Sequence, residues 1–230
     1  MQAPDTLFPP YEAPTLTVDA VVFQFIANRL HIVLVRRKRE PFAGMYALPG
    51  VYTPRGETTR ESFGRALEIK AGIDAKKLGL IQQLYASDTV ARDPRGHAVS
   101  IVYLGLGHDL TCVPSSTTED PLFLPVDELS TLAFDHKEIV ANALMRLQAE
   151  VMHTNLLFAL LPKQFTLTRL QMAYESILGK SLDKRNFRKK ILALDLVEAT
   201  DNYLKGGAHR PAQLYAFKHM GLAEFSQAFV

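Results

Sequence analysis

A glycine- and proline-rich loop that runs directly into a capped helix is the feature that most constrains the fold of this chain. Residues 43–56 contain three glycines and two prolines, which is typical of a loop with special backbone angles. Residues 58–71 follow with helical periodicity, and Gly72 stands where a helix commonly ends in the left-handed conformation. Strand patterns lie on both sides of this loop and helix. The sequence therefore predicts mixed helices and strands rather than one type alone.

The strands are predicted from alternating and β-branched residues. Residues 16–26 and 30–36 alternate, and Asn28-Arg29 between them predicts the turn of a β-hairpin. The other predicted elements are strands 81–85 and 98–106, a polar loop at 114–120 and a long amphipathic helix at 135–153. This order predicts an α+β or mixed α/β sandwich for residues 1–153.

A second domain is predicted for residues 154–230. Thr168 and Gln171 fit a capping box that opens a helix ending before Gly179, and Asp183 is suited to cap the next helix. The predicted order is a short helix at 156–161, helices at 168–178 and from 184 to about 194, and strands at 196–199 and 213–217 around a polar loop. Three helices followed by a two-strand hairpin is the order of a winged helix-turn-helix domain.

The charge of the chain is unevenly distributed. Residues 1–150 hold 15 basic and 18 acidic side chains, a net charge of −3, whereas residues 151–230 hold 11 and 6, a net charge of +5. Six cations fall within eleven residues from Lys180 to Lys190, with Asp183 as the only acid among them. Charge gathered in this way indicates a polyanionic partner, and a solvated helix face is the alternative interpretation.

Composition excludes several classes of protein. The chain is 47% hydrophobic, but its apolar runs are too short to span a bilayer, and Pro162 ends one of them. The first residues have neither a basic nor an apolar region of a secretion signal. Cys112 is the one cysteine, so an internal disulfide and an all-cysteine metal site are excluded. We expect a cytoplasmic protein with no membrane partner.

Residues 48–73, LPGVYTPRGETTRESFGRALEIKAGI, resemble the Nudix box. The preceding Leu48-Pro49-Gly50 fits, and the first box position falls on Val51, where the family has glycine. The box positions that match are Glu57, Arg65, Leu67, Gly72 and Ile73. The resemblance implies a Nudix-type α/β/α sandwich within the α+β class.

The resemblance also shows which box residues differ here. In working members, three glutamates after the box arginine help to hold Mg²⁺ against a pyrophosphate, which requires oxygen ligands. Glu68 lies about 200° around the helix from the first of these positions and does not replace them. A carboxylate from Glu61 or Glu119 is the alternative that would rebuild the site. The three positions hold Ala66, Ile69 and Lys70. We therefore expect no metal site, no catalytic residues and no enzyme activity.

Residues 37–50, 92–96 and 132–136 resemble the ADP-ribose-pyrophosphatase-like branch of the family. The resemblance implies a pocket for phosphate and ribose, in which arginine forks match phosphate oxygens. For each arginine a surface or ion-pair role is the alternative, and for the histidine a place beside a helix cap. The expected ligand-binding residues are Arg37, Gly50, Val51, Glu57, Lys70, Arg92, Arg95 and His136.

Residues 160–190 resemble the C-terminal winged helix of Nudix-related transcriptional regulators, a group that includes the repressor of NAD biosynthesis and the Bacteroidetes arabinose regulator. Phe187, Ile191 and Leu194 share one helix face, so the basic residues face outward and suit the major groove. Asn186 is expected either to contact adenine or to complete the helix cap. The expected DNA-binding residues are Lys184, Arg185, Asn186, Arg188, Lys189 and Lys190 on this helix, and Lys205, His209 and Arg210 in the wing loop.

Together these features predict a homodimeric transcriptional regulator, a repressor of NAD metabolism genes, that binds double-stranded operator DNA. Its effector is expected to be a small molecule such as ADP-ribose or a related phosphorylated ribose, with no cofactor. Three alternatives stay open: an active Nudix pyrophosphohydrolase with an appended domain, an arabinose-type sugar sensor and an adaptor for an acidic protein partner.

Overall fold

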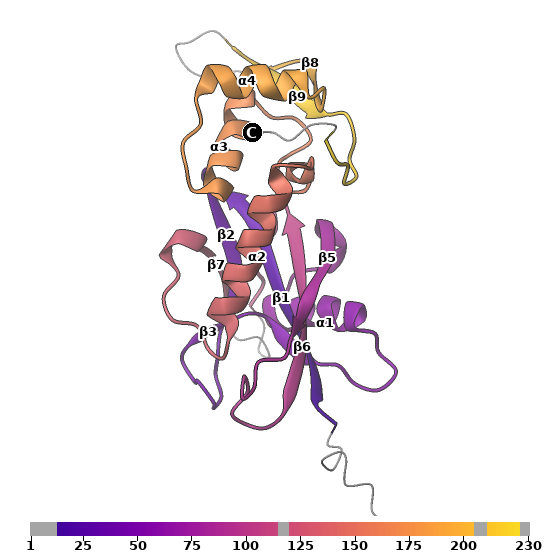
Figure 1. Cartoon of the computed structure of the whole chain (residues 1–230), viewed down its shortest axis with the longest axis vertical. Coiled ribbons are helices and arrows are strands. Elements are labelled where there is room, and N and C mark those ends of the chain that lie inside the picture. The colour runs from indigo at the N-terminus through magenta and orange to yellow at the C-terminus, as the bar shows by residue number, and fades with distance from the viewer. Residues whose placement is uncertain (1–12, 115–119, 205–210, 226–230) are drawn as a thin grey trace, which may run out of the picture.

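The computed structural model describes residues 13–114, 120–204 and 211–225. A mixed sheet with α1 and α2 on it forms one end of an elongated molecule, and α3, α4 and the β8–β9 hairpin form the other (Figure 1). The strands are β1 Thr15–Ile26, β2 Arg29–Arg36, β3 Tyr46–Ala47, β4 Gly50–Tyr52, β5 Leu78–Ser87, β6 Ala98–Gly107, β7 Pro121–Pro125, β8 Val197–Leu204 and β9 Ala212–Phe217. The helices are α1 Thr59–Ala71, α2 His136–Val151, α3 Leu167–Leu178 and α4 Lys184–Ala193, with short 3₁₀ turns η1 Ala75–Lys77, η2 Val126–Glu128 and η3 Leu156–Ala159.

The sheet is ordered β3-β2-β1-β6-β5, with β4 added to β1 and β7 to β2. β6 pairs with β1 in parallel along the whole length of β6, and the other pairs of this sheet are antiparallel. Side chains of β1 alternate between the two faces because successive residues of a strand point in opposite directions. Val18, Ala20 and Val22 pack with α1, whereas Val21 and Phe23 pack with α2. The predicted α/β/α sandwich is confirmed.

The local sequence rules explain α1 well. Thr58 accepts a hydrogen bond from the backbone of Glu61, and Glu61 accepts one from the backbone of Thr58, so a complete capping box begins the helix. Gly72 ends it at φ 65°, the left-handed conformation that glycine adopts most easily. A β-carbon at Gly72 would also lie 2.4 Å from the carbonyl oxygen of Val113. The glycine is therefore required by backbone angle and by space.

Four predicted details are wrong. The hairpin turn consists of Ala27 and Asn28, both at positive φ, because two-residue turns of this hand match the twist of the strands. The cap of α3 is Thr166, not Thr168, because Thr166 has extended backbone angles and its hydroxyl accepts from Arg169 N at 3.1 Å. The predicted loop at 43–56 contains β3 and β4, and β8 extends to Leu204 beyond the predicted strand.

The winged-helix end packs directly on the sandwich. One hydrophobic cluster runs from β1 and α2 through η3 into α3 and α4. Leu30 N donates to Ser176 Oγ at 2.6 Å, and Gln148 Nε2 donates to the carbonyl oxygen of Ile177 at 2.9 Å. A β-carbon at Gly79 on β5 would lie 2.9 Å from Ala159 Cα, so glycine permits the close approach of η3. Within the described residues, none of the helices has the length and apolarity needed to cross a membrane.

Candidate ligand cavity and nucleic-acid interface

A cavity of about 680 Å³ lies at the end of the sandwich away from the winged helix, which is large enough for a nucleotide-sized ligand. Its walls come from β1, β4, α1, the segments after β2 and β5, and the start of α2. Seven cationic and three acidic side chains lie among the lining residues. These residues are Thr17, Asp19, Arg37, Lys38, Arg39, Glu40, Leu48, Gly50, Val51, Tyr52, Arg65, Ile69, Lys70, Arg92, Asp93, Arg95, Phe134 and His136.

A buried ion-pair network forms the floor of the cavity. Arg92 donates to Asp19 Oδ2 at 2.8 Å and to both carboxylate oxygens of Asp135 at 2.8 and 2.9 Å. All three side chains are at most 8% exposed. Burial alone would raise the pKa of Asp19, but His136 and Arg92 hold it well below the usual range. The Arg92 guanidinium therefore lines the cavity but is paired with two carboxylates. This is the ion-pair role that the sequence analysis gave as the alternative to binding phosphate.

Asp135 directly precedes α2, yet its side chain makes no capping hydrogen bond to that helix. Its carboxylate instead accepts from Ser87 Oγ at 2.8 Å and from Arg92. His136, the first residue of α2, accepts a hydrogen bond at Nδ1 from Leu48 N at 2.9 Å. Because Nδ1 is the acceptor, the ring proton belongs on Nε2, which lies 3.5 Å from Asp19 Oδ1. The start of α2 is thus part of the cavity wall.

Two arginines lie against one aromatic ring at another wall. The guanidinium carbons of Arg37 and Arg95 are 4.7 and 5.5 Å from the centroid of the Phe134 ring. Arg95 also forms a two-point pair with Asp93, which lowers the pKa of that carboxyl. The Arg95 side chain stays 45% exposed. It can therefore reach a ligand with less reorganisation than Arg92.

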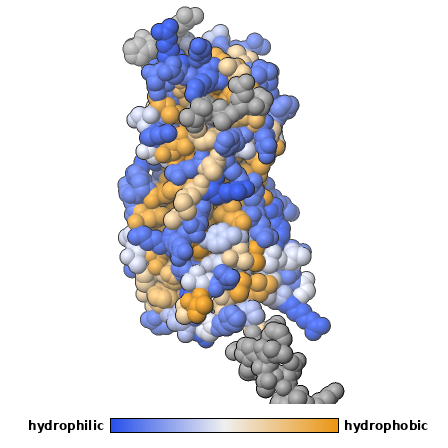
Figure 2. Space-filling model, in the orientation of Figure 1, coloured by the Kyte–Doolittle hydropathy of each residue, from blue (hydrophilic) through white to orange (hydrophobic). Residues whose placement is uncertain are grey.

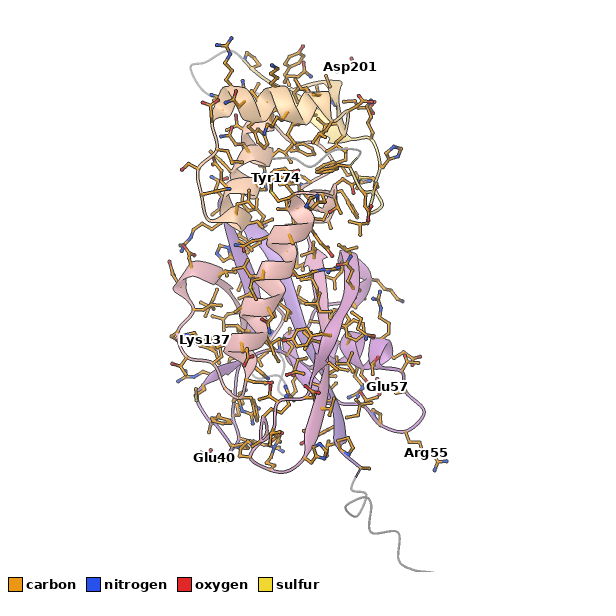
Figure 3. The ribbon with its side chains drawn as sticks, viewed as in Figure 1. Glu40, Arg55, Glu57, Lys137, Tyr174 and Asp201 are labelled. Atoms are coloured by element: carbon orange, nitrogen blue, oxygen red, sulfur yellow. The ribbon has the colours of Figure 1, made fainter. Side chains whose placement is uncertain are left out.

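The third wall is the face of α1 that carries the Nudix-box positions. Ala66 is completely buried, whereas Ile69 and Lys70 line the cavity. Glu57 is not among the lining residues, and both of its oxygens accept from Arg65 Nε, at 2.9 and 3.1 Å. Figure 3 shows Glu57 beside α1.

Of the two carboxylates considered as replacements, the structure describes Glu61. Glu61 Oε2 accepts from both N and Oγ1 of Thr58, so this carboxylate serves the helix cap. Glu119 lies outside the described residues. Among the residues that the structure describes, no three acidic, histidine or cysteine side chains are grouped as metal ligands would be. The side chains of Ala66, Ile69 and Lys70, two apolar and one cationic, do not fit a hard cation, which prefers oxygen ligands.

Seven of the eight expected ligand residues line this one cavity, all except Glu57. Position 50 favours glycine for a steric reason, because a β-carbon there would lie 2.5 Å from Asp19 Oδ1. Sequence reasoning missed Asp19, and it included Phe134 and Asp135 in a segment of the expected pocket without giving either residue a role. An acidic residue inside an otherwise apolar strand is the signal that could have identified Asp19.

The expected DNA-binding helix is α4. Phe187 and Ile191 are 2% and 1% exposed. The Phe187 ring packs edge-on against the Tyr174 ring of α3, with the two ring centroids 5.5 Å apart. Asn186 N donates to Asp183 Oδ1, so the cap uses the backbone of Asn186 and leaves its side chain exposed. All six expected residues of this helix are exposed: Lys184, Arg185, Asn186, Arg188, Lys189 and Lys190.

The surroundings of α4 suit a polar partner. Hydrophilic residues predominate at the end of the molecule at which α4 lies, with apolar residues among them (Figure 2). Figure 3 shows Tyr174 inside this end and Asp201 of β8 at its outer edge. The β8–β9 hairpin lies next to α4 as a wing does. The expected wing residues Lys205, His209 and Arg210 lie outside the described residues.

A Nudix-type sandwich that packs on a winged helix defines a class of transcriptional regulators. The model of the NrtR DNA-binding winged helix domain matches residues 157–217. The ADPR responsive transcriptional repressor NtrR of Acinetobacter baylyi is 34% identical over 212 residues, which cover 90% of this chain and 83% of that protein.

Solved structures agree with this assignment. Shewanella oneidensis NrtR, in complex with a 27mer DNA, superposes with a TM-score of 0.74 and 31% identity over 88% of this chain and 93% of that one. The Nudix domain of the same protein, in complex with ADP-ribose, superposes with a TM-score of 0.55 and 29% identity over 64% of this chain and 99% of that one. The chain belongs to the NrtR family of transcriptional repressors.

Proposed function

We propose that this chain is a repressor that binds operator DNA through α4 and the wing, and that releases DNA when ADP-ribose or a related phosphorylated ribose occupies the cavity. Residues 1–153 form the sensor and residues 154–230 the DNA-binding domain. The protein acts as a cytoplasmic homodimer and regulates NAD metabolism genes. It binds its effector without hydrolysing it.

The observation that carries this proposal is that α2 joins the cavity to the winged helix. His136 at its first residue lines the cavity, and Gln148 near its end donates to the backbone of α3 at Ile177. α3 in turn packs on α4 through the Tyr174–Phe187 pair. Lys137, labelled in Figure 3, marks the cavity end of this connection. A ligand that prefers one position of α2 would therefore bias the position of α4.

The lining charges support an anionic effector. Arg37, Lys70 and Arg95 come from three different segments of the chain, namely the segment after β2, α1 and the segment after β5. Arginine and lysine side chains are well suited to bind phosphate. A plain sugar such as arabinose carries no charge to match them. The ADP-ribose complex of the Shewanella oneidensis Nudix domain, which superposes on this half of the chain, supports the same ligand class.

The DNA-binding part of the proposal is tested on α4. A labelled duplex from upstream of the protein's own operon is titrated with the full chain over a range of salt concentrations. Arg185→Ala should cost about 1–3 kcal/mol and relax base preference, because an arginine fork reads a base edge. Lys189→Ala should weaken all duplexes about equally and reduce the salt slope by about one, because lysine suits phosphates. Lys137→Ala removes the same charge at the cavity end of α2 and should leave DNA affinity unchanged. Equal affinity of all four proteins would exclude α4 as the reading surface.

The absence of hydrolysis has its own test. The protein is incubated with ADP-ribose and Mg²⁺ or Mn²⁺, and AMP is measured. No AMP is expected because Ala66, Ile69 and Lys70 supply no carboxylate oxygen. Turnover near an ordinary enzyme rate of about 1 per second would contradict the proposal.

A further inference from the structure

Lys70 stands at a position where the Nudix box has a metal-binding glutamate, and it lines the cavity together with Arg65 and Ile69 of the same helix. The side chains at the box positions do not fit a divalent cation. Ala66 is buried and apolar, Ile69 is apolar, and Glu57 has both oxygens on the Arg65 guanidinium. A ligand diphosphate in this cavity therefore needs another source of positive charge.

The cavity itself supplies that charge. Two of its three acidic side chains are neutralised locally, since Asp19 pairs with Arg92 and Asp93 pairs with Arg95. Seven lining side chains are cationic and three are acidic, so the lining carries a net positive charge. Of these cations, Lys70 is the one on the helix face from which the box glutamates would reach a metal. A lysine ammonium is a compact point charge with three donors, the side chain that best imitates a small hydrated cation next to phosphate oxygens.

We propose that Lys70 takes the place of the divalent cation, so that the cavity holds the diphosphate of its effector without metal. This inference rests on the proposed function of the cavity as a site for ADP-ribose. No bond is made or broken, because the ammonium contacts phosphate oxygens and activates no water. Sensing by this chain then depends on the concentration of the effector alone and is unaffected by the concentration of Mg²⁺.

The test is calorimetric titration of the full chain with ADP-ribose, once in excess EDTA and once in millimolar Mg²⁺. The wild-type affinity should be the same in both buffers within about twofold. Lys70→Gln should weaken binding about tenfold in both buffers, because a charge-assisted contact to phosphate is lost. Lys70→Glu should bind poorly in EDTA and recover in Mg²⁺, because one carboxylate together with substrate phosphates is a common Mg²⁺ site. Recovery in Mg²⁺ would also show that this variant is folded.

Lys76→Gln is the matched control. Lys76 is an exposed lysine of η1 that does not line the cavity, so the same loss of charge should leave affinity unchanged in both buffers. Thermal unfolding of each variant verifies that the fold is kept.

The outcomes separate this inference from the proposed function. Wild-type binding that is lost in EDTA, or Lys70→Gln binding equal to wild type, overturns the role of Lys70 while the cavity remains an ADP-ribose site. The absence of wild-type binding in both buffers overturns the proposed function and the role of Lys70 with it. Metal-independent binding that only the Lys70 variants lose supports both.

Discussion

Replacement of Arg92 by methionine is predicted to lower the free energy of unfolding by about 3–5 kcal/mol at neutral pH. The Arg92 side chain is 5% exposed, and its carboxylate partners Asp19 and Asp135 are 7% and 8% exposed. Methionine matches the unbranched apolar stem of arginine but has no charge and no donors. Two buried carboxylates would therefore remain close together without their common counter-ion, and an uncompensated buried charge is strongly destabilising.

The pH dependence of this loss follows from the pKa of Asp19. In the wild type this pKa is depressed, so the ionised form contributes stability above the unfolded value near 3.8. That contribution is lost only as pH falls toward the folded pKa. In Arg92→Met the burial effect is offset by His136 and Ser100 but no longer by Arg92, so the pKa of Asp19 is higher than in the wild type. The difference from wild type should therefore shrink as pH is lowered from 7 to about 5.

The assay is urea unfolding followed by circular dichroism at the two pH values. Arg95→Met is the matched control, because Arg95 is 45% exposed and pairs with Asp93 near the surface. This control should cost less than about 1 kcal/mol. The reasoning would be refuted if both variants lost the same stability at pH 7, or if the Arg92→Met loss grew on acidification.

Four further substitutions test the packing. Gly179→Ala should lower the free energy of unfolding by about 1–2 kcal/mol, because this residue has φ 65° in open space. Gly72→Ala should cost more in the same urea assay, because its β-carbon would also meet Val113. Equal losses of stability in the two variants would contradict this clash. Phe187→Ala should lower stability by about 3–5 kcal/mol, because the ring is 2% exposed between α3 and α4, and a loss below 1 kcal/mol would contradict that packing. Asn155→Ala removes the side-chain hydrogen bonds that hold residues 219–223. Proteolysis of this segment should increase, as limited trypsin digestion and mass spectrometry can measure. An unchanged digestion pattern would show that Asn155 does not hold this segment in place.

Local sequence rules could predict those parts of the fold that depend only on residues close together in the chain. The glycine at Gly72 and the cap at Asp183 each depend on neighbouring residues, and the structure has both. Thr58, which was predicted as part of the helix, is the residue that caps it. The missed strand β7 is different. It begins and ends with proline, which sequence rules associate with loops, and it forms because β2 offers an antiparallel edge far away in the chain.

The candidate cavity was predicted as a list of residues rather than as a network. The Nudix-box resemblance placed Lys70, and the resemblance of other segments placed Arg37 and His136. The partners of Arg92 could not be predicted, because Asp19 and Asp135 are 73 and 43 residues away from it in the sequence. Only the parallel pairing of β1 with β6 and the position of α2 bring these charges together.

The central claim is that a ligand in the cavity weakens DNA binding at α4. Its most direct test is the affinity of the full chain for the upstream duplex, measured by fluorescence anisotropy at fixed salt with and without saturating ADP-ribose. The account predicts that ADP-ribose weakens DNA binding by about 5–150-fold, and that DNA weakens ADP-ribose binding by the same factor. ADP-ribose that binds the protein and leaves the dissociation constant for DNA unchanged would contradict it.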